Sequence, residues 1–539
     1  MARSSNRTAP WFEGEKAKRG RSNLREPFPY SDMLPGAGQV LDRKVKQEVF
    51  DVVVVGGGGA GLAAAIEARA AGRSVVLLEK NERLGGSTAW SIGSITATGT
   101  PHQRRKGIVD SPADHWRDMP GFAGTLDDRD NPALRKILCD QVPQAFQWLL
   151  DSGVRFMGPM PEPPHRQPRM HNVLPNSRSF IYHLERRARR AGVDIRTGVR
   201  AQSIVQSDGR ACTVECRHGD GTVRFTARGG LVLAAGDFTN SPACKARFMG
   251  AQEAKVEGVN PTATGDGQGM AEALGARVVN GDLALGPELR FIAPARETLV
   301  RRLPPWRWLA VSMQWSLDHL PGALLRPLMM KFLTTALAPS GALFEQGAVL
   351  VNQRGERFGD ELDRPAWRVP DQPGKLAWII IDDALATRFS AWPHFVSTAP
   401  GIAYAYVPDY RRNRRDVFTR APTVGDLAAR LGMDPTALAH STAQERDGKR
   451  LGAGPFVALG PVRSVFVHSE GGLMVDVNHR VLGADDQPLA GLYAAGSTGQ
   501  GGLLLKGHGH HLAWAFVSGR RAGRFAAKEA EAETAVPDA

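Results

Sequence analysis

Three glycines and one glutamate have the spacing of a nucleotide-binding unit. Gly56, Gly58 and Gly61 follow the β-branched run Val52–Val55, and Glu79 ends a second apolar run 18 residues after Gly61. Bare backbone at the start of a helix offers amide N–H groups to a phosphate, and a carboxylate at the end of the next strand accepts hydrogen bonds from both hydroxyls of a ribose. The unit therefore predicts a bound dinucleotide whose ribose carries a free 2′-hydroxyl.

A strand, a helix and a second strand must hold these residues in place. The run Val52–Val55 is typical of a parallel strand that is covered on both faces, and the small residues from Ala60 onward allow a helix, ending near Ala71, to lie close to the sheet. Residues 74–78 form the second apolar strand. This order predicts an α/β fold with a Rossmann-like domain, but the unit alone does not distinguish FAD from NAD.

The next segment, "EKNERLGGSTAWSIGS" (Glu79–Ser94), places two glycines, Ser87 and Thr88 soon after the ribose acid. It resembles the flavin domain of FAD-dependent oxidoreductases of the fumarate reductase / succinate dehydrogenase flavoprotein and 3-ketosteroid dehydrogenase superfamily. Four later segments resemble that superfamily in the same order along the chain: "GGLVLAAGDFTNS" (Gly229–Ser241), "ATGDGQGMAEALGA" (Ala263–Ala276), "AVLVNQRGERFGDE" (Ala348–Glu361) and "GLYAAGSTGQGG" (Gly491–Gly502).

The resemblance implies FAD, held extended with its flavin ring at a domain junction. Some members attach the flavin through a histidine near the serine-threonine loop. No histidine adjoins Ser87 and Thr88, so we expect non-covalent FAD. The resemblance implies these cofactor-binding residues: Gly56, Gly58, Ala60, Gly61, Glu79, Lys80, Gly86, Ser87, Thr88, Gly93, Ala235, Gly236, Asp266, Gly496, Ser497, His511 and Leu512.

The resemblance also implies a discontinuous FAD-binding domain, residues 47–290 and 455–527, with an inserted α+β cap domain at 291–454. Residues 1–46 are basic and contain Pro, Gly and Ser, which predicts an irregular arm, and the charged residues 528–539 predict a frayed tail. The four cysteines are scattered, and the N-terminal region lacks the apolar run of a signal peptide. Both features favour a reducing, cytoplasmic setting.

One histidine and one lysine are the first candidates for contact with a substrate. His468 stands three residues before Gly471-Gly472, and the resemblance to fumarate reductases implies that it holds a substrate carboxylate. The alternative is a polar residue that is hydrogen-bonded within the junction. The same resemblance implies that Lys506 occupies the place of a substrate-binding arginine. Because lysine keeps the charge but loses the bidentate geometry, an ordinary dicarboxylate substrate is disfavoured.

Proton transfer has three further candidates. Glu361 and Arg364 would share one face of a helix, and the resemblance implies a proton relay, whereas a salt bridge within the cap is the alternative. The arginine that such a relay serves is not evident, because Ala386 stands in its place and Arg388 follows two residues later. Tyr404 is the candidate that corresponds to the tyrosines of the ketosteroid dehydrogenase branch, and core packing of an alternating strand explains it equally well.

The histidines His508, His510 and His511 invite a metal interpretation, since three imidazoles within four residues can chelate a cation. No acidic or cysteine partner is evident in the sequence. We therefore predict no metal and a hydrogen-bonding role beside flavin or substrate, with helix capping as the alternative.

The segment Trp306–Pro339 is rich in Trp, Leu and Met, but charged residues interrupt it, so it is not a spanning helix. An extra helical layer on the cap, an apolar substrate entrance, and a peripheral contact with a membrane or partner are the three interpretations. The chain carries 68 Lys and Arg against 55 Asp and Glu, a net charge of +13. No groove-reading motif accompanies this charge, so nucleic-acid binding is not expected.

Together these features predict an FAD-dependent oxidoreductase. It would transfer hydride across a C–C bond next to a carbonyl or carboxyl group of a bulky, apolar small molecule, as a dehydrogenase or an ene-reductase, with an unidentified electron acceptor or donor. One alternative is a fumarate-reductase-like flavoprotein subunit that passes electrons to a membrane or Fe–S partner. Another is a non-catalytic flavin-binding module.

Overall fold

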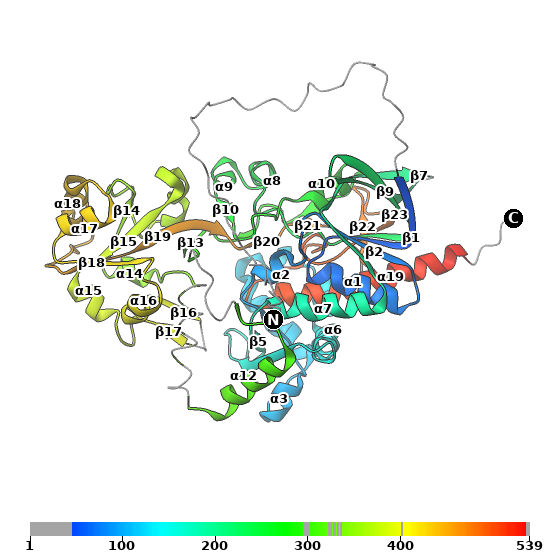
Figure 1. Cartoon of the computed structure of the whole chain (residues 1–539), viewed down its shortest axis with the longest axis horizontal. Coiled ribbons are helices and arrows are strands. Elements are labelled where there is room, and N and C mark those ends of the chain that lie inside the picture. Colours follow the sequence, from blue (N-terminus) through cyan, green and yellow to red (C-terminus); the bar gives the residue numbers. More distant parts are fainter. Residues whose placement is uncertain are drawn as a thin grey trace, which may run out of the picture. The chain divides into compact units, whose positions relative to one another are not determined.

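The computed structural model describes residues 46–207, 209–294, 302–321, 326, 330, 334, 337–399 and 403–534 (Figure 1). The expected N-terminal arm lies outside the described residues, except for Lys46, the first residue of β1 (Lys46–Val55). The expected tail differs from the structure. Helix α19 (His510–Thr534) continues beyond residue 528, and Ala530 is buried because it packs against Gly229, which has no side chain to keep the helix away.

A largely parallel sheet forms the core of the first lobe. Its strands follow the order β22-β23-β9-β1-β2-β6, and all neighbours in this order except β22 and β23 are parallel. The run Val52–Val55 lies at its centre and is buried, as predicted. The bounds are β2 (Val75–Glu79), β6 (Asp194–Thr197), β9 (Gly221–Leu233), β22 (Arg480–Leu482) and β23 (Pro488–Ala494), and the hairpin β7 (Val199–Ser207) and β8 (Arg210–His218) extends from β9.

Two helices pack on this sheet, and glycines let them lie close to each other. Helix α1 (Gly59–Ala70) follows β1, and α19 crosses it closely. A Cβ on Gly519 would lie 2.3 Å from the Ala60 carbonyl oxygen, and one on Gly523 would lie 2.2 Å from that of Ala64. The α/β architecture predicted from the sequence is confirmed, and α7 (Arg178–Ala191) also packs against α1.

A second sheet forms the core of the other lobe, with β19 (Phe456–Phe466) pairing to most of its strands. The expected boundaries differ here: β19 was placed in the FAD-binding domain, yet it belongs to the cap sheet. A buried apolar run has the same sequence pattern in either domain, and only the strands with which β19 pairs show that it belongs to the cap sheet. The remaining elements are β10 (Glu257–Gly258), β13 (Glu288–Phe291), β14 (Val349–Asn352), β15 (Ala377–Ile381), β18 (Phe418–Ala421), α14 (Ala342–Glu345), α15 (Asp383–Arg388), α16 (Val407–Asn413), α17 (Val424–Leu431) and α18 (Pro435–Ala443).

A small antiparallel sheet completes the first lobe, in the order β3-β5-β4. Helix α12 (Arg307–His319) packs against β4 and β5, so this part of the apolar segment covers the small sheet rather than the cap. The strands of this small sheet are β3 (Ser94–Thr96), β4 (Arg155–Met160) and β5 (Met170–Leu174). The further short strands of the chain are β11 (Val278–Val279), β12 (Ala284–Leu285), β16 (Ser397–Ala399), β17 (Ala403–Ala405), β20 (His468–Ser469) and β21 (Gly472–Leu473). The further α-helices are α2 (Gly86–Trp90), α3 (Pro101–Arg105), α4 (Pro112–Asp118), α5 (Pro120–Ala123), α6 (Pro132–Asp151), α8 (Pro242–Phe248), α9 (Ala251–Ala254) and α10 (Asp266–Glu272).

Candidate functional site

A groove opens at the end of β1, between that strand and the start of α1. Packing against the protein's own backbone is enough to require glycine at two of the three positions, Gly56 and Gly61. A Cβ on Gly56, whose φ is 112°, would lie 2.3 Å from the Ala234 carbonyl oxygen, and one on Gly61 would lie 1.8 Å from that of Gly56. A Cβ on Gly58 would meet no protein atom closer than 3.9 Å. Its missing side chain therefore leaves space in the groove, where an anion can approach the helix start.

Glu79 lies at the far side of this groove and is buried. Its carboxylate accepts hydrogen bonds from the backbone N–H of Gly57 at 2.7 Å and from the backbone and side-chain nitrogens of Asn81 at 2.9 and 2.7 Å. A carboxylate has about four lone-pair positions, so Glu79 keeps capacity for a ribose hydroxyl.

The loop that follows Glu79 returns to the start of α1. The Thr88 hydroxyl accepts a hydrogen bond from the Gly59 N–H at 3.1 Å, and the Ser87 hydroxyl accepts one from the Asn260 side chain at 2.9 Å. Gly93 serves the packing of the chain instead: its φ is 85°, and a Cβ there would lie 2.4 Å from the Val173 side chain.

Lys80 and Asp266 form an ion pair across the groove, with 3.1 Å between Nζ and Oδ2. Burial alone would raise the pKa of Asp266, but the Lys80 ammonium and a hydrogen bond from Thr264 outweigh it and lower the pKa. The pair keeps a carboxylate ionised within reach of a bound ligand.

The groove gathers most of the residues that sequence reasoning selected for the cofactor. Gly61, Gly93, His511 and Leu512 do not line it. Those that do are Gly56, Gly58, Ala60, Glu79, Lys80, Gly86, Ser87, Thr88, Ala235, Gly236, Asp266, Gly496 and Ser497. Sequence reasoning missed the lining residues Val55, Gly57, Gly59, Leu78, Asn81, Val199, Ala201, Ala234, Asn260, Thr262, Ala263, Ala495 and Ala515.

A cluster of two histidines and a glutamate lies at the start of α19. The ring centroids of His468 and His511 are 3.6 Å apart, and their Nε2 atoms lie 3.7 and 3.5 Å from one carboxylate oxygen of Glu470. Both Nε2 atoms are buried and form no hydrogen bond within the described part of the chain. The cluster thus offers two imidazole nitrogens to an oxygen atom of a bound molecule.

Glu470 is held by the loop that precedes α19. Its second oxygen accepts hydrogen bonds from the Gln500 side chain at 2.5 Å and the Leu505 N–H at 3.0 Å. Burial opposes ionisation of Glu470, but the rings of His511 and His468 lower its pKa well below the usual range. Burial, and then the neighbouring His468, lower the pKa of His511 to about 4. At neutral pH, Glu470 is therefore an anion beside a neutral His511.

The other two histidines of the sequence cluster face different groups. The His508 ring lies 2.6 Å from a Glu162 carboxylate oxygen, which also accepts the His508 backbone N–H at 2.8 Å. The Glu162 hydrogen bond raises the pKa of His508. No signal in the Pro-rich segment around Glu162 indicated this contact. The expectation that the cluster lacks an acidic partner is therefore wrong, because Glu162 and Glu470 each lie against one of its rings.

His510 meets two further buried imidazoles, with ring centroids 5.5 Å from His115 and 5.3 Å from His165. The ligand atoms are close enough to surround a metal ion, as are those of His468, Glu470 and His511. The hydrogen bonds favour a different description. Arg169 donates to Nδ1 of His165 at 2.8 Å, so the neutral ring of His165 carries its proton on Nε2. His510 contacts the Lys506 carbonyl oxygen at 2.6 Å and His115 at 3.3 Å.

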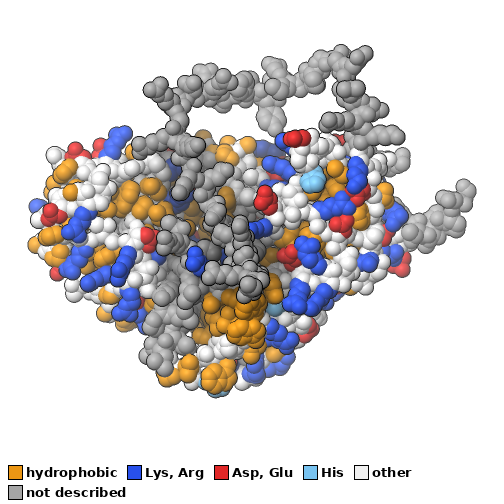
Figure 2. Space-filling view, viewed as in Figure 1, with side chains coloured by type: hydrophobic (Ala, Val, Ile, Leu, Met, Phe, Trp, Pro, Cys, Tyr) orange, Lys and Arg blue, Asp and Glu red, His pale blue; other side chains and the backbone are white. Residues whose placement is uncertain are grey.

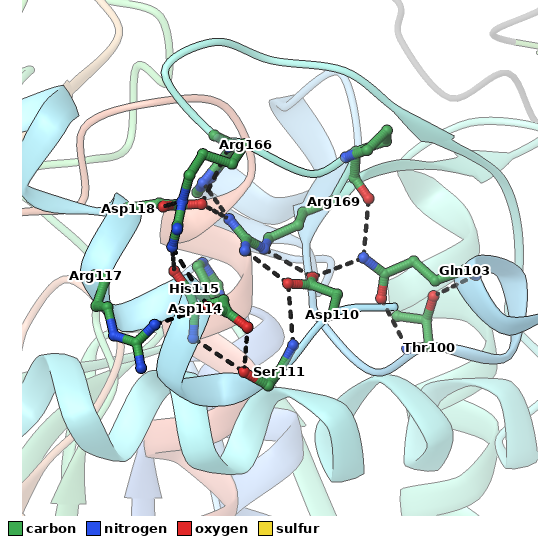
Figure 3. Close-up of polar contacts among 12 residues, drawn as sticks. Thr100, Gln103, Asp110, Ser111, Asp114, His115, Arg117, Asp118, Arg166 and Arg169 are labelled. Atoms are coloured by element: carbon green, nitrogen blue, oxygen red, sulfur yellow. Dashed lines mark hydrogen bonds and ion pairs between the residues drawn. The ribbon is translucent and has the colours of Figure 1, made fainter. Parts of the chain in front are cut away.

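A metal ion there would have to displace the His165 proton beside a guanidinium. Figure 3 shows that Arg169 is itself bound to the carboxylates of Asp110 and Asp118, at 2.7 and 2.6 Å. The three imidazoles are thus the end of a buried hydrogen-bonded network that supports the start of α19.

The remaining catalytic candidates lie as follows. Lys506 is half-buried in the loop between Leu505 and His508, and no described carboxylate forms an ion pair with it. Tyr404 lies in β17, where its ring packs 4.9 Å from Trp392 and 5.0 Å from Phe395.

Glu361 and Arg364 do not form the expected pair. Glu361 is buried and binds Arg357 at 2.7 Å and Arg446 at 2.6 Å, whereas the side chain of Arg364 is 79% exposed. The spacing argument required a helix, but Arg364 precedes Pro365, which disfavours helical backbone, and its φ is 44°. Glu361 does form salt bridges within the cap, as the alternative interpretation had it, but its partners are Arg357 and Arg446 rather than Arg364.

The family model described as "FAD binding domain" matches residues 51–295 and 324–504. The chain therefore belongs to the FAD binding domain family, and it is an FAD-dependent oxidoreductase. The kinship predicted from the sequence motifs is confirmed.

Curated relatives include the NADH:fumarate oxidoreductase of Klebsiella pneumoniae (strain 342), which is 26% identical over 89% of this chain. The chain spans about half of that relative, 48% of its length. The vinyl phenol reductase of Lactiplantibacillus plantarum is 25% identical over 90% of this chain and 97% of its own length.

Solved structures show the same fold. The open conformation of a flavocytochrome c3 fumarate reductase has a TM-score of 0.67, with 25% identity over 90% of this chain and 79% of that one. The 3-ketosteroid-Δ4-(5α)-dehydrogenase of Rhodococcus jostii RHA1 has a TM-score of 0.57, with 24% identity over 90% of this chain and 98% of that one.

Proposed function

We propose that this oxidoreductase adds or removes hydrogen across a C–C bond next to a carbonyl or carboxyl group, using non-covalent FAD. The observation that carries the proposal is the pair of buried imidazole nitrogens, on His468 and His511, beside the single charge of Glu470. The loop of Gly496 and Ser497 lines the groove, and Gln500, three residues after Ser497, donates to Glu470. This loop links the candidate cofactor groove to the imidazole pair.

The residues of the groove fit a dinucleotide. The open space at Gly58 suits a pyrophosphate at the start of α1, and Glu79 suits the ribose. Ser87 and Thr88 are hydrogen-bonded to Asn260 and Gly59, and residues 85–94 contain no histidine for covalent attachment. Bound FAD would supply a centre that accepts or returns a hydride.

The protein's own groups would handle charge and protons. The neutral ring of His511 and the imidazole of His468 can donate hydrogen bonds to a substrate oxygen, and Lys506, in the loop before α19, adds a cationic side chain. His508 is the better candidate for moving a proton than Glu361 or Arg364, because Glu162 raises its pKa and half of its side chain is exposed. We propose conjugated acids or ketones with an apolar body as substrates, since Lys506 lacks the bidentate geometry for a dicarboxylate and one relative is a vinyl phenol reductase.

Reoxidation of the reduced holoprotein tests this function. The flavin is photoreduced without oxygen, unsaturated acids, enones and vinyl phenols are added, and the return of the visible flavin band is followed. His468→Ala should keep its FAD and lose about 10²-fold in turnover. Reduced protein that none of these compounds reoxidises would indicate a non-catalytic flavin-binding module, and unchanged turnover of the variant would remove His468 from the site. Acid precipitation should release all flavin into the supernatant.

A further inference from the structure

Helix α12 turns an aromatic face to solvent. Trp308 is 64% exposed, Val311 46% and Trp315 57%, and their spacing of three and four residues places them on one side of the helix. Trp306, just before the helix, is also exposed and packs 5.6 Å from Trp308. An exposed apolar surface of this kind marks a contact site more often than isolated exposed residues do.

The opposite face of α12 is anchored to the protein. Ala310 is buried, and the Gln314 side chain lies 3.3 Å from the His102 ring. The helix packs on β4 and β5 through this side. The tryptophans are therefore presented by a fixed helix, and their exposure is a property of the fold.

Positive charge borders the same surface. Arg186 and Arg307 line a shallow hollow with Trp306, Trp308 and Trp315, and neither arginine forms an ion pair with a carboxylate among the described residues. In Figure 2 hydrophobic side chains gather over the region that carries α12 in Figure 1, with Lys and Arg side chains beside them. The surface therefore combines indole rings with guanidinium groups that, within the described part of the chain, form no ion pair; Arg186 donates to the Tyr182 hydroxyl.

We propose that this face, formed by Trp306, Trp308, Val311, Trp315, Arg186 and Arg307, docks onto an anionic phospholipid bilayer. Indole rings favour the interface between lipid headgroups and acyl chains, and guanidinium groups bind phosphates. Helices of the described residues are too short or too polar to cross a bilayer, so this contact is made at the surface. The net charge of +13 adds a long-range attraction to anionic lipid. This contact is independent of the reaction proposed above.

Vesicle flotation of the full-length holoprotein tests the proposal without any turnover. The probes are vesicles of phosphatidylcholine mixed with phosphatidylglycerol, and vesicles of phosphatidylcholine alone. The protein should float with the mixed vesicles at low salt, and binding should weaken as salt rises. Trp308→Ala with Trp315→Ala should reduce the partition coefficient about tenfold per tryptophan. Arg186→Gln with Arg307→Gln should reduce it about fivefold per arginine on the mixed vesicles.

Trp392→Ala is the matched control, because Trp392 is 65% exposed and its ring packs against Tyr404 of β17. It should float as the unchanged protein does, and all variants should keep their flavin absorbance. Three results would overturn the proposal: a protein that stays with the soluble fraction, a tryptophan pair whose loss leaves flotation unchanged, or equal binding to phosphatidylcholine alone. Size-exclusion chromatography adds a fourth, since a dimer that the tryptophan variant converts to a monomer would assign this face to a second copy of the chain.

Discussion

Gly58→Ala tests where the phosphates of the dinucleotide lie. The added Cβ would have the Gly85 carbonyl oxygen, 3.9 Å away, as its nearest protein neighbour, and the backbone of Gly58, with φ of −81° and ψ of −172°, is one that alanine adopts without strain. The apoprotein should therefore keep its stability or gain about 0.4–1 kcal/mol, because the unfolded chain loses freedom. FAD affinity should fall, since the methyl group fills space that a phosphate needs. Overpacking costs about 1–3 kcal/mol, or roughly 5- to 150-fold in Kd.

Gly61→Ala is the contrasting change. Its Cβ would lie 1.8 Å from the Gly56 carbonyl oxygen, a distance that forces strand and helix apart. This variant should lose about 1–3 kcal/mol of folding stability or more, before any ligand is added. The two alanines thus separate ligand contact from packing within one motif.

Two measurements on the apoproteins decide between these roles. Quenching of FAD fluorescence on titration gives the Kd, and urea unfolding gives the free energy of unfolding. The reasoning is refuted if Gly58→Ala binds FAD as tightly as the unchanged protein, because the phosphates would then lie away from the start of α1. A lower free energy of unfolding for the Gly58→Ala apoprotein would refute the conclusion that a Cβ at this position meets no protein atom.

Three further predictions concern the anions and the helix packing. Glu470→Gln keeps acceptors for Gln500 and Leu505 but removes the charge that faces the histidines, so the pH profile of turnover should shift and its maximum should fall about 10²-fold while FAD stays bound. Glu162→Gln should lower the pKa of His508 in an NMR titration. The pKa of His508 is raised in the folded state, so the stability that this pair contributes is fully present below about pH 6.5, the ordinary histidine value. That stability is lost as the pH rises through the folded pKa. A free energy of unfolding that does not depend on pH in this range would contradict the pairing. Gly519→Ala should cost about 1–3 kcal/mol in urea unfolding, whereas the control Gly269→Ala, in α10 with open space at its Cβ, should gain about 0.5–1 kcal/mol.

The nucleotide unit could be predicted because its parts are contiguous in the sequence. Strand, glycines, helix and acid follow one another, and their chemistry depends mainly on the backbone. The far wall of the groove could not be predicted, because Val199 and Ala201 come from the β7 strand and have ordinary apolar side chains. Asn260 and Thr262 adjoin a motif that was recognised, but only the fold brings them to Ser87 and Asn81.

The catalytic candidates were harder to place because their arguments assumed a local structure. Glu361 and Arg364 share a face only on a helix, and Pro365 prevents one there. Glu470 stands two residues after His468, so an extended chain places both side chains on one face, but only the fold brings His511 to that face. The histidines after Lys506 were predicted as one cluster, whereas the turn at Gly509, whose φ is 90°, and the start of α19 direct their rings to separate partners.

Two carboxylates fix the loop that precedes α19. Glu470 accepts the Leu505 N–H at 3.0 Å and lies against His511, while Glu162 accepts both the backbone N–H and the ring of His508. Each charge therefore positions a backbone amide and an imidazole at the same time. Lys506 lies between these two anchors, so its position depends on both. Loss of either charge should move the loop and, at the same time, change the protonation of the neighbouring histidine ring. Turnover alone would not separate these two effects, whereas a pH profile of turnover and an NMR titration of the ring would.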